Sequence, residues 1–393
     1  MKKAFWAYLI VAMATMVSTC FAGTSYVVTN NDNASGNSST IYTLNTSTGA
    51  LTHLMDLPTG GTGEGGGYFA TVGNGAAVTG TVGCLLLNDT GSSDVASFKV
   101  NLTNLNITKV GNYTNSAVFD AFPGGSVAAS PNGKFLYVTY GGSENIGAWA
   151  VNADCSLTFI AAYQASVGAD TYDGIRVTPN GADLLVTAPD FSSVEMFSIN
   201  QTTGALTDLG FANFGSLSSC VSFACYPAGI DITADNQAAI FGNYSLLAPS
   251  VLAAQITPTG LKNPTYFALS NTGTLTTNDN VPFLSAAAYH GAGPLFLGFS
   301  GTGSGSQPGV VTATLSEASR SITGKANTPI SSSVDYQGLI ASTGNFMVVS
   351  EWFNILQVFT INSDGTLTPT SQGPVTNNSA SGAYSFFIYP NTR

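Results

Sequence analysis

The sequence predicts an all-β fold, a seven-bladed β-propeller with four antiparallel strands in each blade. Three observations predict it: the composition, seven copies of one repeat, and a C-terminal segment that supplies a strand missing from the first copy. Charged residues make up only 8% of the 393 residues, whereas Gly, Ser, Thr and Asn are abundant, which suits short strands joined by tight turns. The hydrophobic fraction of 44% is sufficient for a folded core.

The repeat is marked by an apolar residue followed by threonine, preceded by a turn rich in Asn, Ser, Thr and Gly. Its seven copies are Leu51-Thr52, Ile107-Thr108, Leu157-Thr158, Leu206-Thr207, Leu275-Thr276, Ile322-Thr323 and Leu367-Thr368. The strand before each turn carries an aromatic residue in six of the seven copies, and the slot holds Tyr42, Phe98, Trp149, Phe197, Phe267, Ala313 and Phe359. Earlier in each unit comes a continuous apolar run, such as FLYVTY, that suits a strand buried on both faces.

The first unit begins at once with the second-strand pattern TSYVVTN and therefore lacks an opening strand. Residues 384–390, YSFFIYP, match the opening pattern. They are expected to complete the first blade and so close the ring, which leaves no sheet edge unpaired.

Residues 1–22 have the features of a cleaved signal peptide: two lysines, an apolar run from Ala4 to Val17, and small residues up to Ala22. We expect an exported protein, periplasmic or extracellular, with residues 23–393 forming a single propeller domain. Lipid anchoring at Cys20 is the alternative. No later apolar segment has the length of a membrane-spanning helix, so membrane insertion is not expected.

Removal of Lys2 and Lys3 leaves eight basic residues against 21 acidic ones. So few cations cannot assemble the patch that neutralises phosphates, so nucleic acid is excluded as a partner. We expect a monomer. Four cysteines remain, and we favour the pairs Cys84–Cys155 and Cys220–Cys225, with four buried free thiols as the alternative.

Residues 130–160, together with TPNGADLLV and TTGALTDL in the next unit, resemble the repeats of the seven-bladed lactonase family. That family includes 6-phosphogluconolactonases, cycloisomerases and exported members of unknown function. The resemblance covers nearly the whole mature chain and implies a site of His, Arg and Glu side chains at one channel mouth. The matching segments in this chain are GGSVAASP, YDGIRVTP and YPAGIDIT, which supply Arg176 and no histidine. A phosphorylated lactone needs several cationic donors, so a neutral lactone is the better candidate substrate.

Tyrosines precede the innermost strands of five units: Tyr68, Tyr172, Tyr226, Tyr336 and Tyr384. A ring of tyrosines at the mouth would offer flat apolar faces and hydroxyl groups to a glycan, a peptide or a small neutral ligand. The alternative is that these rings pack as plugs at the ends of the blades.

Arg176 and Asp231 occupy the same repeat position in adjacent units and are predicted to pair. Such a pair is either structural or a device that polarises a carbonyl group. In an enzyme, Arg176 would polarise the carbonyl while Asp173 or Glu351 directs a water molecule. Trp352, in the loop SEWFNI, is a further predicted ligand contact, unless its aromatic neighbourhood folds back onto another blade.

Acidic residues also lie in connections that lead into innermost strands, namely Glu64, Asp120, Asp170, Asp173 and Asp335. Calcium is the one cofactor that these oxygen ligands suggest, although no EF-hand spacing occurs and solvated loop acids are the alternative. His53, on an outermost strand, and His290, in a surface turn, are not expected to bind a metal. Residues 61–66, GTGEGG, match a dinucleotide motif by letter but open no helix, so we assign them to a flexible connection.

Two functions follow from these residues. The many aromatic and few catalytic groups favour a non-enzymatic propeller that binds a glycan, peptide or protein at the mouth. The alternative is a lactonase-like hydrolase acting on a neutral sugar lactone.

Overall fold

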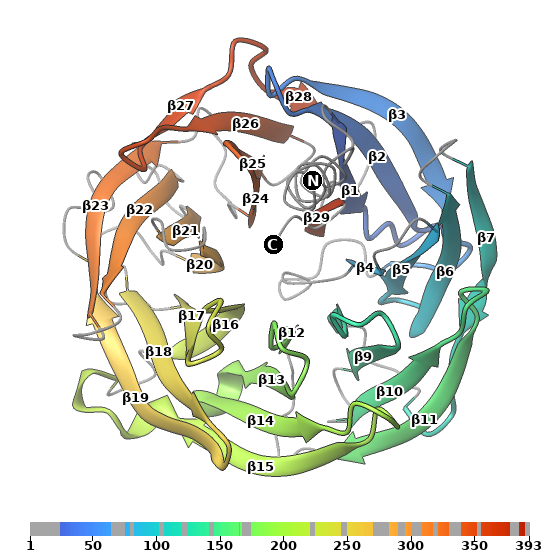
Figure 1. Ribbon diagram of the computed structural model, residues 1–393, viewed down its shortest axis with the longest axis horizontal. Helices are drawn as coiled ribbons and strands as arrows, with labels where there is room; N and C mark the ends of the chain where they lie inside the picture. Colours follow the sequence, from blue (N-terminus) through green and yellow to red (C-terminus); the bar gives the residue numbers. More distant parts are fainter. Residues whose placement is uncertain are drawn as a thin grey trace, which may run out of the picture.

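The computed structural model in Figure 1 shows a ring of seven blades around one axis; a strand pairing between blades 5 and 6 joins these two into one eight-stranded sheet. The residues that it describes are 24–63, 75–78, 82–101, 106–118, 125–140, 145–164, 166, 174–220, 225–244, 250–269, 283–289, 295–300, 309–316, 321–329, 339–351, 355–377 and 385–389. The fold is the all-β seven-bladed propeller that the repeats predicted. Among the described residues, no helix is long and apolar enough to cross a membrane.

Each blade is an antiparallel sheet whose strands succeed one another from the axis outwards (Figure 1). In that order, blade 1 contains β29 (Ser385–Tyr389), β1 (Thr24–Asn30), β2 (Ser38–Asn45) and β3 (Leu51–Pro58). Blade 2 contains β4 (Gly75–Val78), β5 (Val82–Asp89), β6 (Asp94–Asn101) and β7 (Asn106–Tyr113). Blade 3 contains β8 (Val127–Ala129), β9 (Phe135–Tyr140), β10 (Asn145–Val151) and β11 (Leu157–Gln164).

The remaining blades follow the same order. Blade 4 contains β12 (Ile175–Val177), β13 (Asp183–Ala188), β14 (Ser193–Ile199) and β15 (Leu206–Asn213), with 3-10 helices η1 (Pro189–Phe191), η2 (Phe214–Ser216) and η3 (Ser218–Cys220). Blade 5 contains β16 (Tyr226–Ile232), β17 (Ala238–Tyr244), β18 (Ser250–Thr257) and β19 (Gly260–Ala268). Blade 6 contains β20 (Phe283–Tyr289), β21 (Leu295–Ser300), β22 (Gly309–Ser316) and β23 (Ser321–Pro329). Blade 7 contains β24 (Leu339–Thr343), β25 (Phe346–Glu351) and β26 (Ile355–Ile361), and outside β26 lie β27 (Leu367–Pro369) and β28 (Val375–Thr376), which both pair with β26.

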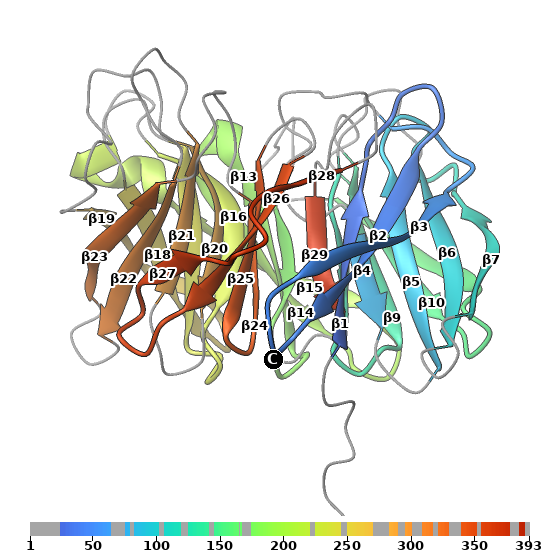
Figure 2. The same ribbon diagram turned by 90° about the horizontal axis from the view of Figure 1, so that it is seen from above.

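The strands run between two faces of the ring (Figure 2). In an antiparallel four-stranded blade, the loop between the second and third strands lies at the same end as the connection to the next blade. We call this end the loop face; its described segments include 31–37, 59–63, 90–93, 189–192 and 214–220. The opposite face carries the turns between third and fourth strands.

The core lies between the blades rather than at a single centre. The described apolar residues form seven buried clusters, each shared by two adjacent blades. Ile175 and Val177 of β12, for example, pack with Tyr137 of blade 3. The aromatic slots at Tyr42 and Phe197 are at most 1% exposed, which stabilises each blade contact by roughly 1.5–3 kcal/mol.

The ring is closed by the C-terminal strand, as predicted. Strand β29 pairs with β1 through Val27 opposite Ile388. A second contact across this seam comes from Gln372, whose amide donates to the carbonyl oxygen of Leu51 and accepts from the Leu51 N–H, both at 2.6 Å. Two kinds of contact therefore join the last part of the chain to blade 1: the pairing of β29 with β1, and the side-chain amide of Gln372, which bonds to both backbone groups of Leu51 as a neighbouring strand would.

Blade 5 differs from the prediction. Phe267 lies on the fourth strand, β19, opposite Val251, instead of in the third-strand slot. The true turn is the short segment 257–260, after which Leu261 pairs with Ile256. The Leu275-Thr276 copy of the repeat lies outside the described residues, and Ala254 occupies the slot two residues before Ile256.

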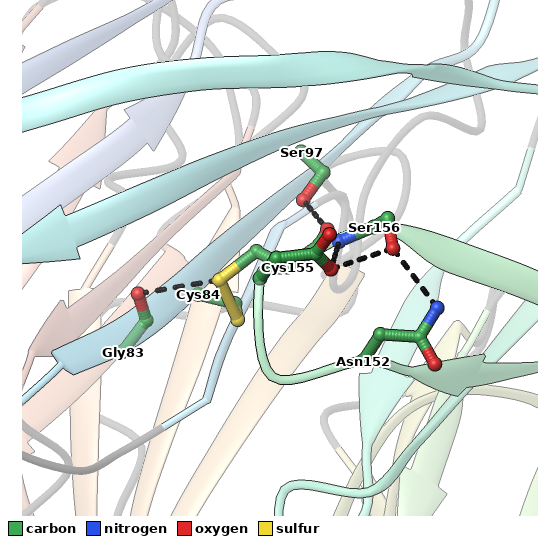
Figure 3. Close-up of a disulfide and its surroundings, with 7 residues drawn as sticks. Gly83, Cys84, Ser97, Asn152, Cys155 and Ser156 are labelled. Atoms are coloured by element: carbon green, nitrogen blue, oxygen red, sulfur yellow. Dashed lines mark hydrogen bonds between the residues drawn. A yellow bond between two sulfur atoms is a disulfide. The ribbon is translucent and has the colours of Figure 1, made fainter.

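Both favoured disulfides are present. Cys84 of β5 is bonded to Cys155, in the turn between β10 and β11, and this bond joins blades 2 and 3 (Figure 3). Cys220 is bonded to Cys225 within the connection that leads to β16. Disulfides are typical of proteins that fold outside the cytoplasm, which is compatible with export.

Candidate functional site

Three of the predicted site residues are described with their side chains: Arg176, Asp231 and Tyr226. Glu351 is the last residue of β25, but its side chain is outside the described part. Six further predicted residues lie outside the described residues altogether: Tyr68, Tyr172, Asp173, Tyr336, Trp352 and Tyr384.

The predicted pairing of Arg176 and Asp231 is present on the two innermost strands of blades 4 and 5. Arg176 alternates with Ile175 and Val177, which face blade 3, so its side chain turns towards blade 5. There one guanidinium nitrogen, Nη2, lies 3.7 Å from Oδ1 of Asp231. The sequence found this contact because the two residues hold the same repeat position.

The two partners differ in exposure. The Asp231 side chain is 1% exposed, whereas that of Arg176 is 38% exposed. Asp231 Oδ1 also accepts a hydrogen bond of 2.9 Å from the N–H of Ile232, which fixes the carboxylate on its own strand. A buried carboxylate thus lies on one side of the guanidinium of Arg176, whose side chain as a whole is partly exposed near the ring axis. Its planar N–H donors suit a carbonyl or carboxylate oxygen.

Tyr226 begins β16 directly after the Cys220–Cys225 disulfide, at the loop face. Its N–H donates to Oδ1 of Asn243 at 2.9 Å, and Asn243 donates to the hydroxyl of Ser250 at 2.7 Å. Partial burial raises the pKa of the Tyr226 phenol, and the negative charge of Asp190 raises it further. The phenol therefore stays protonated at neutral pH.

The structure does not bring Tyr226 next to the ion pair. Tyr226 and Asp231 lie opposite Tyr244 and Ile240 of β17, which are four residues apart because β16 has a bulge, so the separation is roughly 13 Å at the usual rise per residue. A ligand that touches both groups must extend along the axis. A small ligand contacts one or the other.

A buried pair of carboxyl groups, Asp89 and Asp94, was missed by the sequence reasoning. The two residues flank the loop between β5 and β6, and Asp89 is completely buried. Burial is the largest cause that raises the pKa of Asp89, from 3.8 to about 7, and the charge of Asp94 adds to it. An acid at the end of the apolar run GCLLLND was the available signal.

Metal binding has no candidate among the residues with described positions. No group of three or more His, Cys, Asp or Glu side chains in that part of the chain could hold an ion. Glu64, Asp120, Asp170, Asp173 and Asp335, which suggested calcium, all lie outside it. His53 is on the outermost strand β3, as predicted, 3.3 Å from Asp56.

The ring defines the class of the protein, a seven-bladed β-propeller. Residues 87–223 match the family model described as lactonase, 7-bladed β-propeller. The resemblance indicated by the repeats is therefore confirmed over these residues. No curated protein sequence matches the chain.

Solved structures agree over most of the ring. The periplasmic gluconolactonase of Pseudomonas aeruginosa has a TM-score of 0.67 and 15% identity, over 93% of this chain and 98% of that one. A candidate 6-phosphogluconolactonase from Bacteroides fragilis also has a TM-score of 0.67 and 15% identity, over 94% of this chain and 98% of that chain. At such identities these structures establish the fold.

Proposed function

We propose that this chain is an exported hydrolase that opens a neutral sugar lactone. The observation that carries the proposal is the half-exposed Arg176, held 3.7 Å from the buried Asp231 on innermost strands of a lactonase-type ring. The similarity to a gluconolactonase and to a candidate 6-phosphogluconolactonase supports hydrolysis more than a purely binding role.

In the proposed reaction, Arg176 donates hydrogen bonds to the carbonyl oxygen of the lactone. Water attacks the carbonyl carbon, and the negative charge that develops on oxygen is stabilised by the guanidinium. The ring C–O bond then breaks, the leaving oxygen takes up a proton, and the product is a hydroxy acid. Asp173 or Glu351 is the proposed base that receives the proton of the attacking water.

The charge of the chain supports a lactone without a phosphate group. Only eight basic residues remain after residues 1–22 are removed, against 21 acidic ones. A phosphate group is normally bound by several Lys or Arg donors or by backbone N–H groups. We therefore expect turnover of a neutral aldonolactone to exceed that of its 6-phosphate.

The test compares mature wild-type protein with the variants Arg176→Met, Arg176→Lys and Asp231→Asn. Lactone opening is followed as acid release in a pH-stat, above the spontaneous rate. Removal of a charge-stabilising donor is expected to lower kcat about 100- to 1,000-fold in Arg176→Met. Asp231→Asn is expected to lose about tenfold, because the asparagine still occupies the site but holds the guanidinium less firmly.

Lys262→Met is the matched control, because it removes an exposed cation from the outer strand β19. It should leave turnover unchanged. Wild-type protein that opens none of a panel of neutral lactones, with or without calcium and with or without EDTA, would overturn the proposal. Binding on a glycan or peptide array without turnover would then favour the binding role through the tyrosines.

A further inference from the structure

Three loops of blades 1 and 2 meet tightly on the loop face. They are residues 31–37, 59–63 and 90–93. The N–H of Asn37 donates to Gly61 O at 2.9 Å, that of Gly63 to Asn33 O at 2.8 Å, and that of Gly91 to Thr62 O at 2.9 Å. The first part of the GTGEGG segment, which was predicted to be a flexible connection, is therefore hydrogen-bonded to the other two loops, and its residues 64–66 lie outside the described residues.

The approach is so close that side chains would not fit. A Cβ on Gly61 would collide with the Asp89 carboxylate, and a Cβ on Gly63 would collide with the backbone of Asp32. Glycine is needed here for space, which is also why the segment resembles a nucleotide motif by letter.

Asp89 and Asp94 lie under these loops and are linked by amides from both blades. Asp89 Oδ1 accepts from Asn37 of blade 1 at 2.8 Å. The side-chain amide of Asn112, on β7, reaches both acids, at 3.2 Å from Asp89 Oδ2 and 2.5 Å from Asp94 Oδ1. One amide therefore bridges the two carboxyl groups, and the negative charge of Asp94 adds to the effect of burial on the pKa of Asp89. A direct hydrogen bond between the two carboxyl groups would require a proton on one of them.

The charged and titratable groups around this pair come from four elements. Asp32, in loop 31–37, accepts from the hydroxyl of Thr90 at 2.5 Å and brings a third acid to the loops. Lys109 of β7 lies against Gly60, and Tyr140 of β9 is close enough to Asp94 for the carboxylate charge to raise the phenol pKa. Glu64 follows Gly63 outside the described residues. Acids thus predominate around the pair.

We propose that Asp89, Asp94, Asn37 and Asn112 form an acid latch, in which one proton shared by the two carboxyl groups holds the loops of blades 1 and 2 together. Loss of this proton places two negative charges in one buried site. The Asp89–Asp94 hairpin and residues 59–63 then separate, and with them the start of the connection into β4.

The direction of the pH effect follows from the pKa of Asp89, which is raised in the closed latch to about 7, above its ordinary value of 3.8. The closed state keeps its proton between these two values, whereas the open state loses it. The latch is therefore most stable below about pH 4. It weakens by up to about tenfold per pH unit as pH rises towards 7, and the effect levels off above pH 7.

Hydrogen–deuterium exchange on the full mature protein tests the latch. Exchange of peptides that cover 59–63 and 89–94 is measured from pH 4 to 8 and corrected for the intrinsic pH dependence of amide exchange. In wild type, protection should fall at least 100-fold between pH 4 and pH 7 and then level off. Asp89→Asn should remove this dependence, because an amide cannot lose a proton in this range. Asp94→Asn should make it smaller, because the charge of Asp94 no longer raises the pKa of Asp89 while burial still does.

Asp208→Asn, on the exposed side of β15, is the control and should retain the wild-type profile. Flat corrected protection in wild type, or an unchanged profile in either latch variant, would overturn the proposal. If one variant fails to fold, the wild-type profile and the other variant still decide. The readout involves no turnover, so its outcome is separate from that of the lactone assays.

Discussion

One left-handed residue ends the turn between third and fourth strands in several blades. Gly49, Gly204 and Gly365 have φ of 72°, 74° and 81°, and Cys155 takes the same place at 69°. The carbonyl oxygen of this residue accepts a hydrogen bond from the preceding blade, as from Tyr137 to Gly204 at 3.1 Å and from Ser97 to Cys155 at 2.5 Å (Figure 3). The residue at this turn position is therefore restricted in two ways, by its positive φ and by its contact with the preceding blade.

A comparison of Gly204→Ala with Gly373→Ala should separate the cost of the positive φ from the cost of a collision with the preceding blade. Both glycines have φ of 74°, but a Cβ on Gly204 would collide with the ring of Phe135, whereas nothing lies within 4 Å of one on Gly373. Gly373→Ala should cost about 1 kcal/mol for its backbone conformation, and Gly204→Ala about 2–4 kcal/mol. Urea unfolding of both variants measures the difference. Equal losses would show that the contact with Phe135 has no effect.

A contact between two residues could be predicted from the sequence where both residues hold the same position of the repeat. Arg176 and Asp231 share a repeat position in neighbouring units, so their contact followed from the alignment of the units. Asp89 and Asn37 are 52 residues apart, hold different repeat positions, and meet only because two loops cross on the loop face. The repeat pattern of the sequence therefore does not predict this contact.

At the scale of strands and hairpins, the apolar second strands were the most reliable signal. Runs such as FLYVTY and DLLVTA became β9 and β13, because only a strand buried on both faces is continuously apolar. The prediction for blade 5 was wrong because Leu275-Thr276 matches the signature of the repeat. The turn between the third and fourth strands of this blade lies at 257–260 and is followed by Leu261-Lys262 instead of the signature. Hairpin turns that lack the usual residues are hard to locate by pattern.

The two disulfides should differ in their effect on stability. Cys84 and Cys155 are separated by 71 residues, and Cys220 and Cys225 by 5. By the loop-entropy argument, loss of the first bond costs about 4 kcal/mol and loss of the second about 2 kcal/mol. Urea unfolding of Cys84→Ala/Cys155→Ala and Cys220→Ala/Cys225→Ala measures the two losses. A larger loss in the second pair would contradict this ranking.

At the scale of the whole ring, several side-chain hydrogen bonds join blade 7 to blade 1. The side chain of Tyr42 donates to Asn377 at 2.7 Å, and Asn377 donates in turn to Asn31 at 3.1 Å. Together with Gln372 and β29, these bonds tie the last part of the chain to blade 1. The seam could be predicted from YSFFIYP, but its side-chain bonds could not, because they involve no repeated position.

Gln372→Ala should therefore destabilise the protein more than its partial exposure suggests. The substitution leaves the N–H and the carbonyl group of Leu51 without their 2.6 Å partners, which costs about 2–3 kcal/mol in total. Gln201→Ala removes an exposed amide with one long bond of 3.4 Å and is the control. Thermal unfolding of both variants checks this. Equal midpoints would mean that Gln372 does not stabilise the seam.

Closure by β29 also determines when blade 1 can be completed during synthesis. Strand β1 precedes the other described strands along the chain, whereas its inner neighbour, Ser385–Tyr389, follows all of them. Until then a nascent chain carries an open β-edge, the kind of surface to which chaperones and other unfolded chains attach. For this protein the exposed edge of β1 thus persists while the other described strands of all seven blades are made, and it is covered once Ser385–Tyr389 is in place.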